Sequence, residues 1–267
     1  MTIRDNPTFY QSGRRMIFNG TMTSEHCSDG PFVYQNIHTL GHKARFVEQH
    51  IEYVKRAAEE YFGANAVPKI SATRLREEIA TLLKFNGISP NASTKVELRV
   101  DAGSNYYLLC GKATIYAGYS LRSIRPAAIC VHSNMPMNNY PTSASLATRQ
   151  MCDAVARSKG YRAAVIAESD GGVAIEPAMP VFIVKEYDVF TPTGCDSVEF
   201  LLAERAIRQA GYRLTQRRVL TADINDADEI FWVDWQGITS AMQIGQRPCM
   251  DIIANKVANI MEKIKTL

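Results

Sequence analysis

The sequence contains neither a long apolar run nor a strong excess of one charge. No stretch approaches the ~20 consecutive apolar residues that a membrane-spanning helix needs, so we expect no membrane segment. The 30 basic and 27 acidic residues are mixed along the chain and leave a net charge of +3, which is too even to indicate nucleic-acid binding. The N-terminus lacks the apolar core of a signal peptide, so we predict a cytoplasmic protein.

Cysteine is sparse, with six residues in a chain of 267, and no two cysteines form a C-x-x-C pair. Scattered cysteines in a chain of this length are typical of reduced thiols in the cytosol. A local group of metal-ligating residue types comprises His26, Cys27, His38 and His42. Because the spacing of this group matches no zinc motif, we expect no metal site.

Length and composition fit an ordinary globular protein of one large or two ordinary domains, with 46% hydrophobic and 21% charged residues. In the first half, the pair Asn19-Gly20 predicts a hairpin turn. Apolar residues at helical spacing predict helices over 44–62 and 71–87, the second with Ser71 as its N-cap. Runs rich in β-forming residues predict strands over 32–39, 95–100, 105–119 and 126–132.

A segment with two prolines and two asparagines, MPMNNYPT at 135–142, interrupts this pattern. We therefore predict an N-terminal domain at 1–133, a linker at 134–142 and a C-terminal domain at 143–267. In the C-terminal domain, apolar spacing predicts helices over 143–159, 197–211 (with Asp196 or Ser197 as N-cap), 222–228 and 250–266. Short apolar runs predict strands over 164–167, 173–175, 181–184, 189–192, 212–220 and 229–235.

One acidic residue, Glu176, stands alone at the end of an apolar run in the stretch AESDGGVAIEPAMPVFIVKEYDVFTP at 167–192. A carboxylate among strands is expensive to bury unless another group pairs with it. Glu176 is therefore either a solvated residue at a strand end or a residue with a specific partner. The residues around it favour the second interpretation.

This stretch resembles the second domain of the class IV pyridoxal-phosphate enzymes, which include branched-chain and D-amino-acid aminotransferases and aminodeoxychorismate lyase. The family's pattern is a turn, a strand that ends in Glu, a strand of type N-x-F-x-V, and a Thr-Pro pair before a helix. This chain matches the pattern except at the Asn, which is replaced around Met179-Pro180, with one residue fewer before Phe182. The resemblance implies a mixed α+β and α/β fold of fold type IV, with a small N-terminal α+β domain and a larger, β-barrel-like C-terminal domain with helices. It also implies a homodimer. In the family the glutamate faces the pyridine nitrogen of the cofactor, and Glu176 occupies the matching position.

The lysine that forms the family's Schiff base has no counterpart in this chain. In the family it lies a few residues before an Asn-Tyr pair. Asn139-Tyr140 matches that pair, so the lysine position is Met135 or Pro136, yet no lysine occurs between Lys112 and Lys159. Lys185 falls at a predicted hairpin tip, where a solvated surface lysine is expected.

The family's phosphate-binding residues are also replaced. In the family's H-x-x-R pattern, the histidine corresponds to His50 of this chain. The position of the phosphate-binding arginine is held by Tyr53, which has no positive charge. The family's G-I-T-R loop corresponds to residues 197–200, where Glu199 brings a negative charge, and its G-T-x-A loop corresponds to residues 234–237. The family positions for cofactor binding, all substituted, are Tyr53, Ser197, Val198, Glu199 and Trp235.

We therefore predict that the chain keeps the family's fold without its standard chemistry, with no covalently bound pyridoxal phosphate. Glu176 and Tyr140 remain as catalytic candidates, and the cleft between the domains binds another small molecule. The cleft residues Tyr53, Tyr140, Glu176, Glu199, Asp234 and Trp235 are acidic and aromatic, which suits a cationic or neutral ring-bearing ligand.

Three alternatives remain open from the sequence. The chain could be an active pyridoxal-phosphate aminotransferase or aminodeoxychorismate lyase with a non-standard site. It could be a cofactor-free lyase or isomerase that uses Glu176 as general acid or base, assisted by Tyr140. It could also be a partner subunit whose filled cleft serves only stability.

Overall fold

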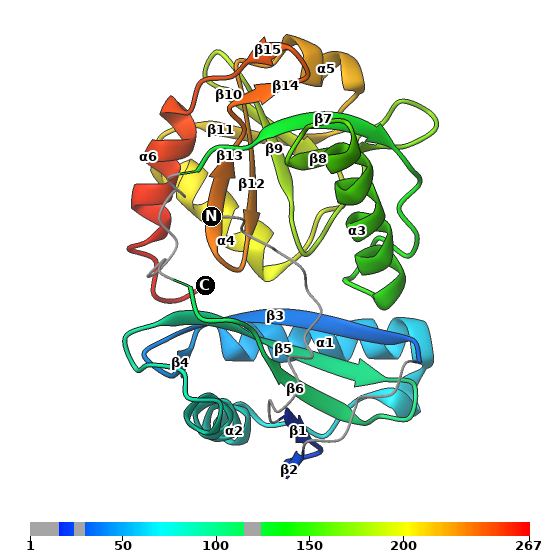
Figure 1. The fold of residues 1–267 in the computed structure, drawn as a ribbon, viewed down its shortest axis with the longest axis vertical. Helices are drawn as coiled ribbons and strands as arrows, with labels where there is room; N and C mark the ends of the chain where they lie inside the picture. Colours follow the sequence, from blue (N-terminus) through cyan, green and yellow to red (C-terminus); the bar gives the residue numbers. More distant parts are fainter. Residues whose placement is uncertain (1–15, 24–29, 115–123) are drawn as a thin grey trace.

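The computed structural model describes residues 16–23, 30–114 and 124–267. The first half of the chain builds one six-stranded antiparallel sheet in the order β2-β1-β6-β5-β3-β4, the lower part of the molecule in Figure 1. Its strands are β1 (Met16–Phe18), β2 (Thr21–Thr23), β3 (Phe32–Leu40), β4 (Lys43–Ala44), β5 (Ser93–Asp101) and β6 (Tyr106–Cys110).

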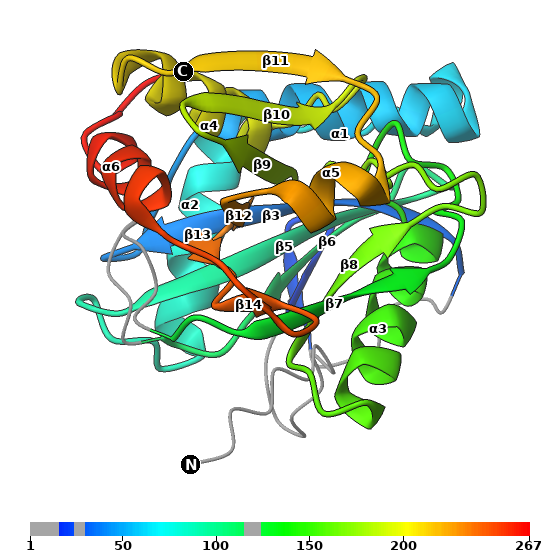
Figure 2. The same cartoon turned by 90° about the horizontal axis from the view of Figure 1, so that it is seen from above.

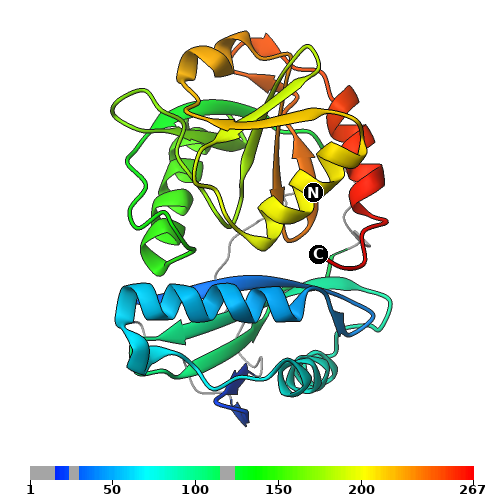
Figure 3. The ribbon, with the colours of Figure 1, turned by 180° about the vertical axis from the view of Figure 1, so that it is seen from behind.

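One face of this sheet is covered by helices α1 (Val47–Phe62) and α2 (Ala72–Phe85), seen from the helix side in Figure 3. A short 3₁₀ turn, η1 (Ala64–Ala66), lies between the two helices. The Ser71 side chain accepts a hydrogen bond from the Arg74 backbone, which confirms the predicted cap. Apolar side chains of both helices pack on alternate residues of β3 and β5, among them Ile37 and Leu98.

The other face of the same sheet is polar. Tyr34 lies opposite Arg99 and His38 opposite Lys95 in the β3–β5 register, so these four side chains point to the same side. Glu97 lies between Lys95 and Arg99 on β5 and shares that side. This polar face meets the second half of the chain.

The second half contains two sheets with an apolar core between them. The five-stranded sheet has the order β11-β10-β9-β12-β13, with β9 (Val181–Lys185), β10 (Asp188–Pro192), β11 (Arg213–Arg217), β12 (Glu229–Asp234) and β13 (Gly237–Ser240). The four-stranded sheet has the order β15-β14-β7-β8, with β7 (Ala127–His132), β8 (Ala163–Ala167), β14 (Gln243–Ile244) and β15 (Arg247–Pro248).

Helices cover the outer faces of these two sheets. Helix α3 (Ser143–Ser158) packs on the four-stranded sheet, while α4 (Val198–Gln209) and α6 (Ile252–Met261) pack on the five-stranded sheet. Helices α3 and α6 therefore lie on opposite sides of this half, as the view from above shows (Figure 2). The short helix α5 (Thr221–Asp226) adds Ile224 to the core between the sheets. None of the helices in the described ranges is long and apolar enough to cross a membrane.

Most predicted elements are present, but several differ from the prediction. The strand predicted over 212–220 ends at Arg217, and strands β13, β14 and β15 were not predicted. The strand predicted over 105–119 ends at Cys110, and its remainder from residue 115 lies outside the described residues. Residues 173–175 form no strand, because Val173 makes only a single bridge to Ala167. The last helix begins at Ile252 and ends at Met261, so it is shorter than predicted. The domain limits at 133 and 143 stay a prediction.

Candidate functional site

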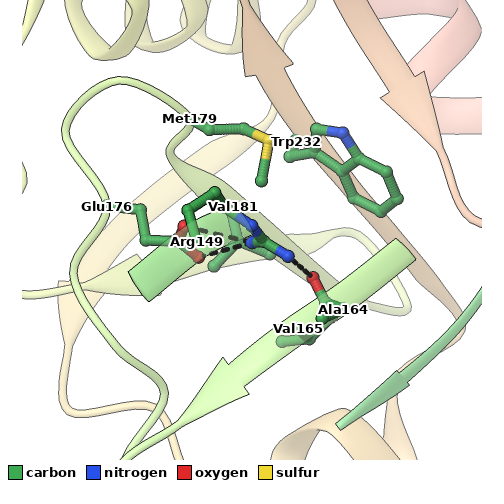
Figure 4. A pocket seen from close by; sticks show the side chains of 7 residues that line it. All are labelled: Arg149, Ala164, Val165, Glu176, Met179, Val181 and Trp232. Atoms are coloured by element: carbon green, nitrogen blue, oxygen red, sulfur yellow. Dashed lines mark hydrogen bonds and ion pairs between the residues drawn. The ribbon is translucent and has the colours of Figure 1, made fainter. Parts of the chain in front are cut away.

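Glu176 lies in the loop between β8 and β9, not at a strand end as predicted, and is only 9% exposed. Arg149, from α3, donates through Nη1 to both of its carboxylate oxygens at 3.0 and 3.1 Å (Figure 4). Burial raises the pKa of Glu176, and the Arg149 charge opposes that rise. Glu176 is thus a buried carboxylate with a specific cationic partner.

Arg149 is held in place by further contacts. The sequence analysis did not identify it as a site residue. Its Nη2 donates to Asp153 Oδ1 and to the Ala164 carbonyl, each at 2.7 Å. Burial lowers the pKa of Arg149, but Glu176 and Asp153 outweigh this effect, so the guanidinium stays charged. The available signal was the α3 periodicity, which puts Arg149 on the same face as the buried residues Cys152 and Ala156.

A cavity of about 10 Å³ lies beside this ion pair. Its lining residues are Arg149, Ala164, Val165, Glu176, Met179, Val181 and Trp232 (Figure 4). That volume is about the space of one water molecule. Arg149 Nε is buried without a hydrogen-bond partner among the described atoms. Tyr140 does not line the cavity, so the structure does not bring the two catalytic candidates together there.

Met135, at the expected lysine position, follows β7 and is 7% exposed. It belongs to an apolar cluster between α3 and the four-stranded sheet, together with Cys152 and Ile166. Of the two positions expected for the lysine, Met135 is therefore a well-buried apolar side chain and Pro136 is partly exposed.

Tyr53 connects α1 to the loop that precedes α4. It is 4% exposed, and its hydroxyl donates to the Asp196 carboxylate. The Arg56 guanidinium lies 4.4 Å from the centre of the Tyr53 ring, and its Nη1 lies 3.6 Å from Asp196 Oδ2. Burial raises the pKa of Tyr53, with the bond to Asp196 adding to the effect. Tyr53 is thus a neutral hydrogen-bond donor.

Tyr140 lies beside α1. Its ring contacts the Tyr61 ring edge-on, with 6.2 Å between centroids. The preceding residue, Asn139, donates to Glu60 of α1 at 2.7 Å. Tyr140 therefore helps to attach the segment before α3 to the first half of the chain.

Ser197, Val198 and Glu199 form the start of α4. Ser197 Oγ accepts from the Phe200 backbone at 3.1 Å, so Ser197 is the N-cap. Val198 is 2% exposed and packs in the core below the helix. Burial, with Asp234 adding to it, raises the pKa of Glu199 to about 8, although a hydrogen bond from Ser197 opposes the rise. Glu199 is thus mostly protonated at neutral pH.

Trp235 lies in the turn between β12 and β13 and is partly exposed. Its ring meets the His38 ring of β3 edge-on, with 6.2 Å between centroids. Asp234 is also partly exposed, and its Oδ1 accepts from the Gln236 backbone at 2.8 Å. This turn therefore brings the Trp235 indole to the polar face of the first sheet.

Among the described residues, no group of three or more His, Cys, Asp or Glu side chains could hold a metal ion. The sequence analysis expected no metal site at His26, Cys27, His38 and His42. Of these residues, only His38 and His42 lie in the described part of the structure. His38 is buried and its pKa is lowered to about 3, first by burial and then by Arg45. It is therefore neutral at physiological pH.

Solved structures share this arrangement. A branched-chain aminotransferase from Thermoproteus uzoniensis, solved with norvaline, matches with a TM-score of 0.76 at 15% identity, over 94% of this chain and 94% of that chain. An aminotransferase from Brucella abortus bound to the cofactor PLP matches with a TM-score of 0.73 at 16% identity, over 92% of this chain and 96% of that chain. A putative 4-amino-4-deoxychorismate lyase from Legionella pneumophila matches with a TM-score of 0.75 at 14% identity, over 92% of this chain and 97% of that chain.

The chain has the class IV aminotransferase fold. This confirms the fold class predicted from the residues around Glu176. No protein-family model and no curated protein matches the sequence. At 14–16% identity, the similarity to solved structures establishes the fold alone.

Within the class IV aminotransferase fold of this chain, Tyr34 lies where the two halves meet, and the sequence analysis missed it. Tyr34 is 4% exposed. Its pKa is raised by burial and by three carboxyl groups: Glu97 of its own sheet, and Glu199 and Glu176 of the other half. The alternating register of β3 and β5 was the available signal, because it places Tyr34, Lys95, Glu97 and Arg99 on one face.

Proposed function

We propose that this chain is a class IV aminotransferase-like protein that binds a small molecule between its two halves and forms no Schiff base with pyridoxal phosphate. The observation that carries the proposal is the environment of Met135. Of the two positions expected for the lysine, Met135 and Pro136, the Met135 side chain is apolar and 7% exposed and packs with Cys152 and Ile166. No lysine occurs between Lys112 and Lys159 to replace it.

The remaining residues support the same conclusion, because they do not fit pyridoxal phosphate. The oxygens of Glu176 already accept from Arg149, so the carboxylate that would face the pyridine nitrogen has a partner from within the chain. Tyr53 donates its hydroxyl to Asp196 and carries no positive charge for a phosphate. Glu199 lies at the start of α4 and offers no positive charge for a phosphate.

An absorption spectrum tests the proposal. The purified protein is incubated with pyridoxal phosphate, dialysed and treated with borohydride, beside a class IV aminotransferase that carries the lysine. We expect this chain to leave dialysis colourless and to show no added mass, while the comparison enzyme keeps its chromophore and is labelled. A chromophore that borohydride attaches to a lysine of this chain would show the proposal to be wrong, and peptide mapping would then identify that lysine.

A second candidate function, a partner subunit with a packed interior, is favoured by one observation. The cavity beside Glu176 holds only about 10 Å³, and Tyr53, Ser197 and Val198 are each buried. Such a protein would bind no small molecule between its halves. By contrast, a lyase or isomerase that uses Glu176 as a free general acid finds no support, because both Glu176 oxygens are bound by Arg149.

We also propose, from the family resemblance, that the protein is a homodimer in the cytoplasm. Light scattering coupled to size-exclusion chromatography would test the assembly. A mass of twice the 29.8 kDa of one chain is expected, and a mass of one chain would contradict it.

A further inference from the structure

Tyr53 and Arg56 lie one turn apart on α1 and face the same residue, Asp196, in the loop before α4. The Tyr53 hydroxyl donates to Asp196 Oδ1, and Arg56 Nη1 lies 3.6 Å from Asp196 Oδ2. In Figure 3 the start of α4, in yellow, lies directly over α1, in blue and cyan. One carboxylate of the second half is thus held through both of its oxygens by the first half.

Arg56 has donors that this contact does not use. Its Nη2 lies 3.8 Å from Glu52 Oε1, so both of its carboxylate contacts are longer than the about 2.7–3.2 Å of an N–H···O hydrogen bond. Arg56 Nε is buried and has no hydrogen-bond partner among the described residues. The guanidinium carries five donors in a planar fork that suits carboxylates and phosphates. Arg56 is therefore an anion-binding group that a single carboxylate does not saturate.

Asp196 also lies at a place where an anion is stabilised by the backbone. It directly precedes Ser197, the N-cap of α4, and a helix start carries partial positive charge. By the family resemblance, Tyr53 holds the place of the phosphate-binding arginine, and residues 197–200 hold the place of a phosphate-binding loop. The carboxylate of Asp196 therefore lies between the two elements that the resemblance assigns to a phosphate.

We propose that Asp196 is a built-in anionic ligand, whose carboxylate occupies the anion site formed by Tyr53, Arg56 and the start of α4 and excludes the phosphate group of an external molecule. A phosphate at this site would share Arg56 with Asp196 and Glu52, and both carboxylates would repel it. The inference rests on the proposed function and goes beyond it, because it names the group that keeps phosphate out. Binding and exclusion here involve no covalent step.

Isothermal titration calorimetry with inorganic phosphate, near neutral pH and at constant ionic strength, tests the inference. The Asp196 side chain is 51% exposed and precedes the helix, so Asp196→Ala should fold, which circular dichroism checks. We expect phosphate to bind at least about ten-fold more tightly to Asp196→Ala than to the wild type. The double variant Asp196→Ala with Arg56→Gln should lose this gain. The control Asp188→Ala removes a carboxylate from the exposed pair with Arg213 and should resemble the wild type.

Three results would overturn the inference. They are a wild type that binds phosphate as tightly as Asp196→Ala, an equal gain in Asp188→Ala, and a gain that survives the loss of Arg56. Asp196→Asn, which keeps an acceptor for the Tyr53 hydroxyl, replaces Asp196→Ala if that variant does not fold, and the same direction is expected. These titrations contain no pyridoxal phosphate, so their failure leaves the borohydride result unaffected. A borohydride-stable pyridoxal adduct would instead show the proposed function itself to be wrong.

Discussion

Arg149 and Glu176 form a buried ion pair in which one guanidinium nitrogen, Nη1, donates to both carboxylate oxygens at 3.0 and 3.1 Å. The pair joins α3 to the loop between β8 and β9, and it lies beside the small cavity near Trp232. Glu176 therefore has its partner within the chain itself. The contribution of this ion pair to the free energy of unfolding can therefore be measured without any ligand.

Replacing Arg149 by Met should destabilise the protein by about 3–5 kcal/mol, because it leaves the Glu176 charge buried without a partner. The double variant Arg149→Met with Glu176→Met should recover a large part of that loss, since no unpaired charge remains. Urea unfolding monitored by circular dichroism measures both free energies. Arg208→Met, in the largely exposed pair with Glu204, is the control and should change stability by less than about 1 kcal/mol. A double variant as unstable as Arg149→Met alone would contradict the expectation.

Met135→Lys tests the environment at the lysine position. The Met135 side chain is apolar and buried, so an ammonium group there loses hydration. We expect a loss of at least about 2 kcal/mol in the free energy of unfolding at neutral pH, and less at high pH, where the amine is neutral. Met151→Lys makes the same substitution at a side chain on α3 that is 65% exposed, and should stay within about 0.5 kcal/mol of the wild type. Equal stability of the two variants would mean that position 135 accommodates a lysine.

The pKa of Glu199 predicts how stability changes with pH. Because burial raises this pKa from 4.5 to about 8, the folded state keeps a proton that the unfolded state has released between these values. The contribution of Glu199 is therefore complete below pH 4.5 and is lost as pH rises through 8, by up to about 1.4 kcal/mol per pH unit. His38 and His50, with pKa values lowered to about 3 mainly by burial, affect stability only below 6.5.

The measurement is urea unfolding of the wild type and Glu199→Gln at several pH values between 6.5 and 8. We expect the stability of the variant relative to the wild type to increase steadily across this range, since only the wild type loses the contribution. Parallel pH profiles of the two proteins would show that Glu199 titrates normally.

Tyr53→Phe tests the contact between α1 and the loop before α4. The substitution removes the hydroxyl that donates to the Asp196 carboxylate, while the ring and the Arg56 contact can remain. Hydrogen bonds to charged groups contribute about 1.5–3 kcal/mol, so we expect a loss of this size in thermal or urea unfolding. Tyr187→Phe, at a side chain that is 78% exposed, should have no measurable effect. An equally small effect at Tyr53 would show that water replaces the hydroxyl without cost.

Much of the fold was predictable because local patterns specify local structure. Helical spacing predicted α1 and α2, and Ser71 was identified as a cap from its residue type and position. The apolar runs on either side of the tip at 185–188 predicted the hairpin of β9 and β10. The last helix was overestimated because the apolar spacing continues beyond its ends. The start of α6 is instead set by Glu229 of β12, whose carboxylate accepts hydrogen bonds from the first backbone amides of the helix.

By itself, the sequence determined the order of helices and strands, the class IV aminotransferase fold and the absence of a lysine near Asn139-Tyr140. These features depend on periodicity, turn residues and residue identity, which are properties of short segments. Only the tertiary structure decided the partners of the site residues. Arg149 meets Glu176 across 27 positions and Tyr53 meets Asp196 across 143, and no local pattern specifies such pairs. The burial of Glu199 was likewise decided by the fold, because the exposure of a side chain depends on every element that packs around it.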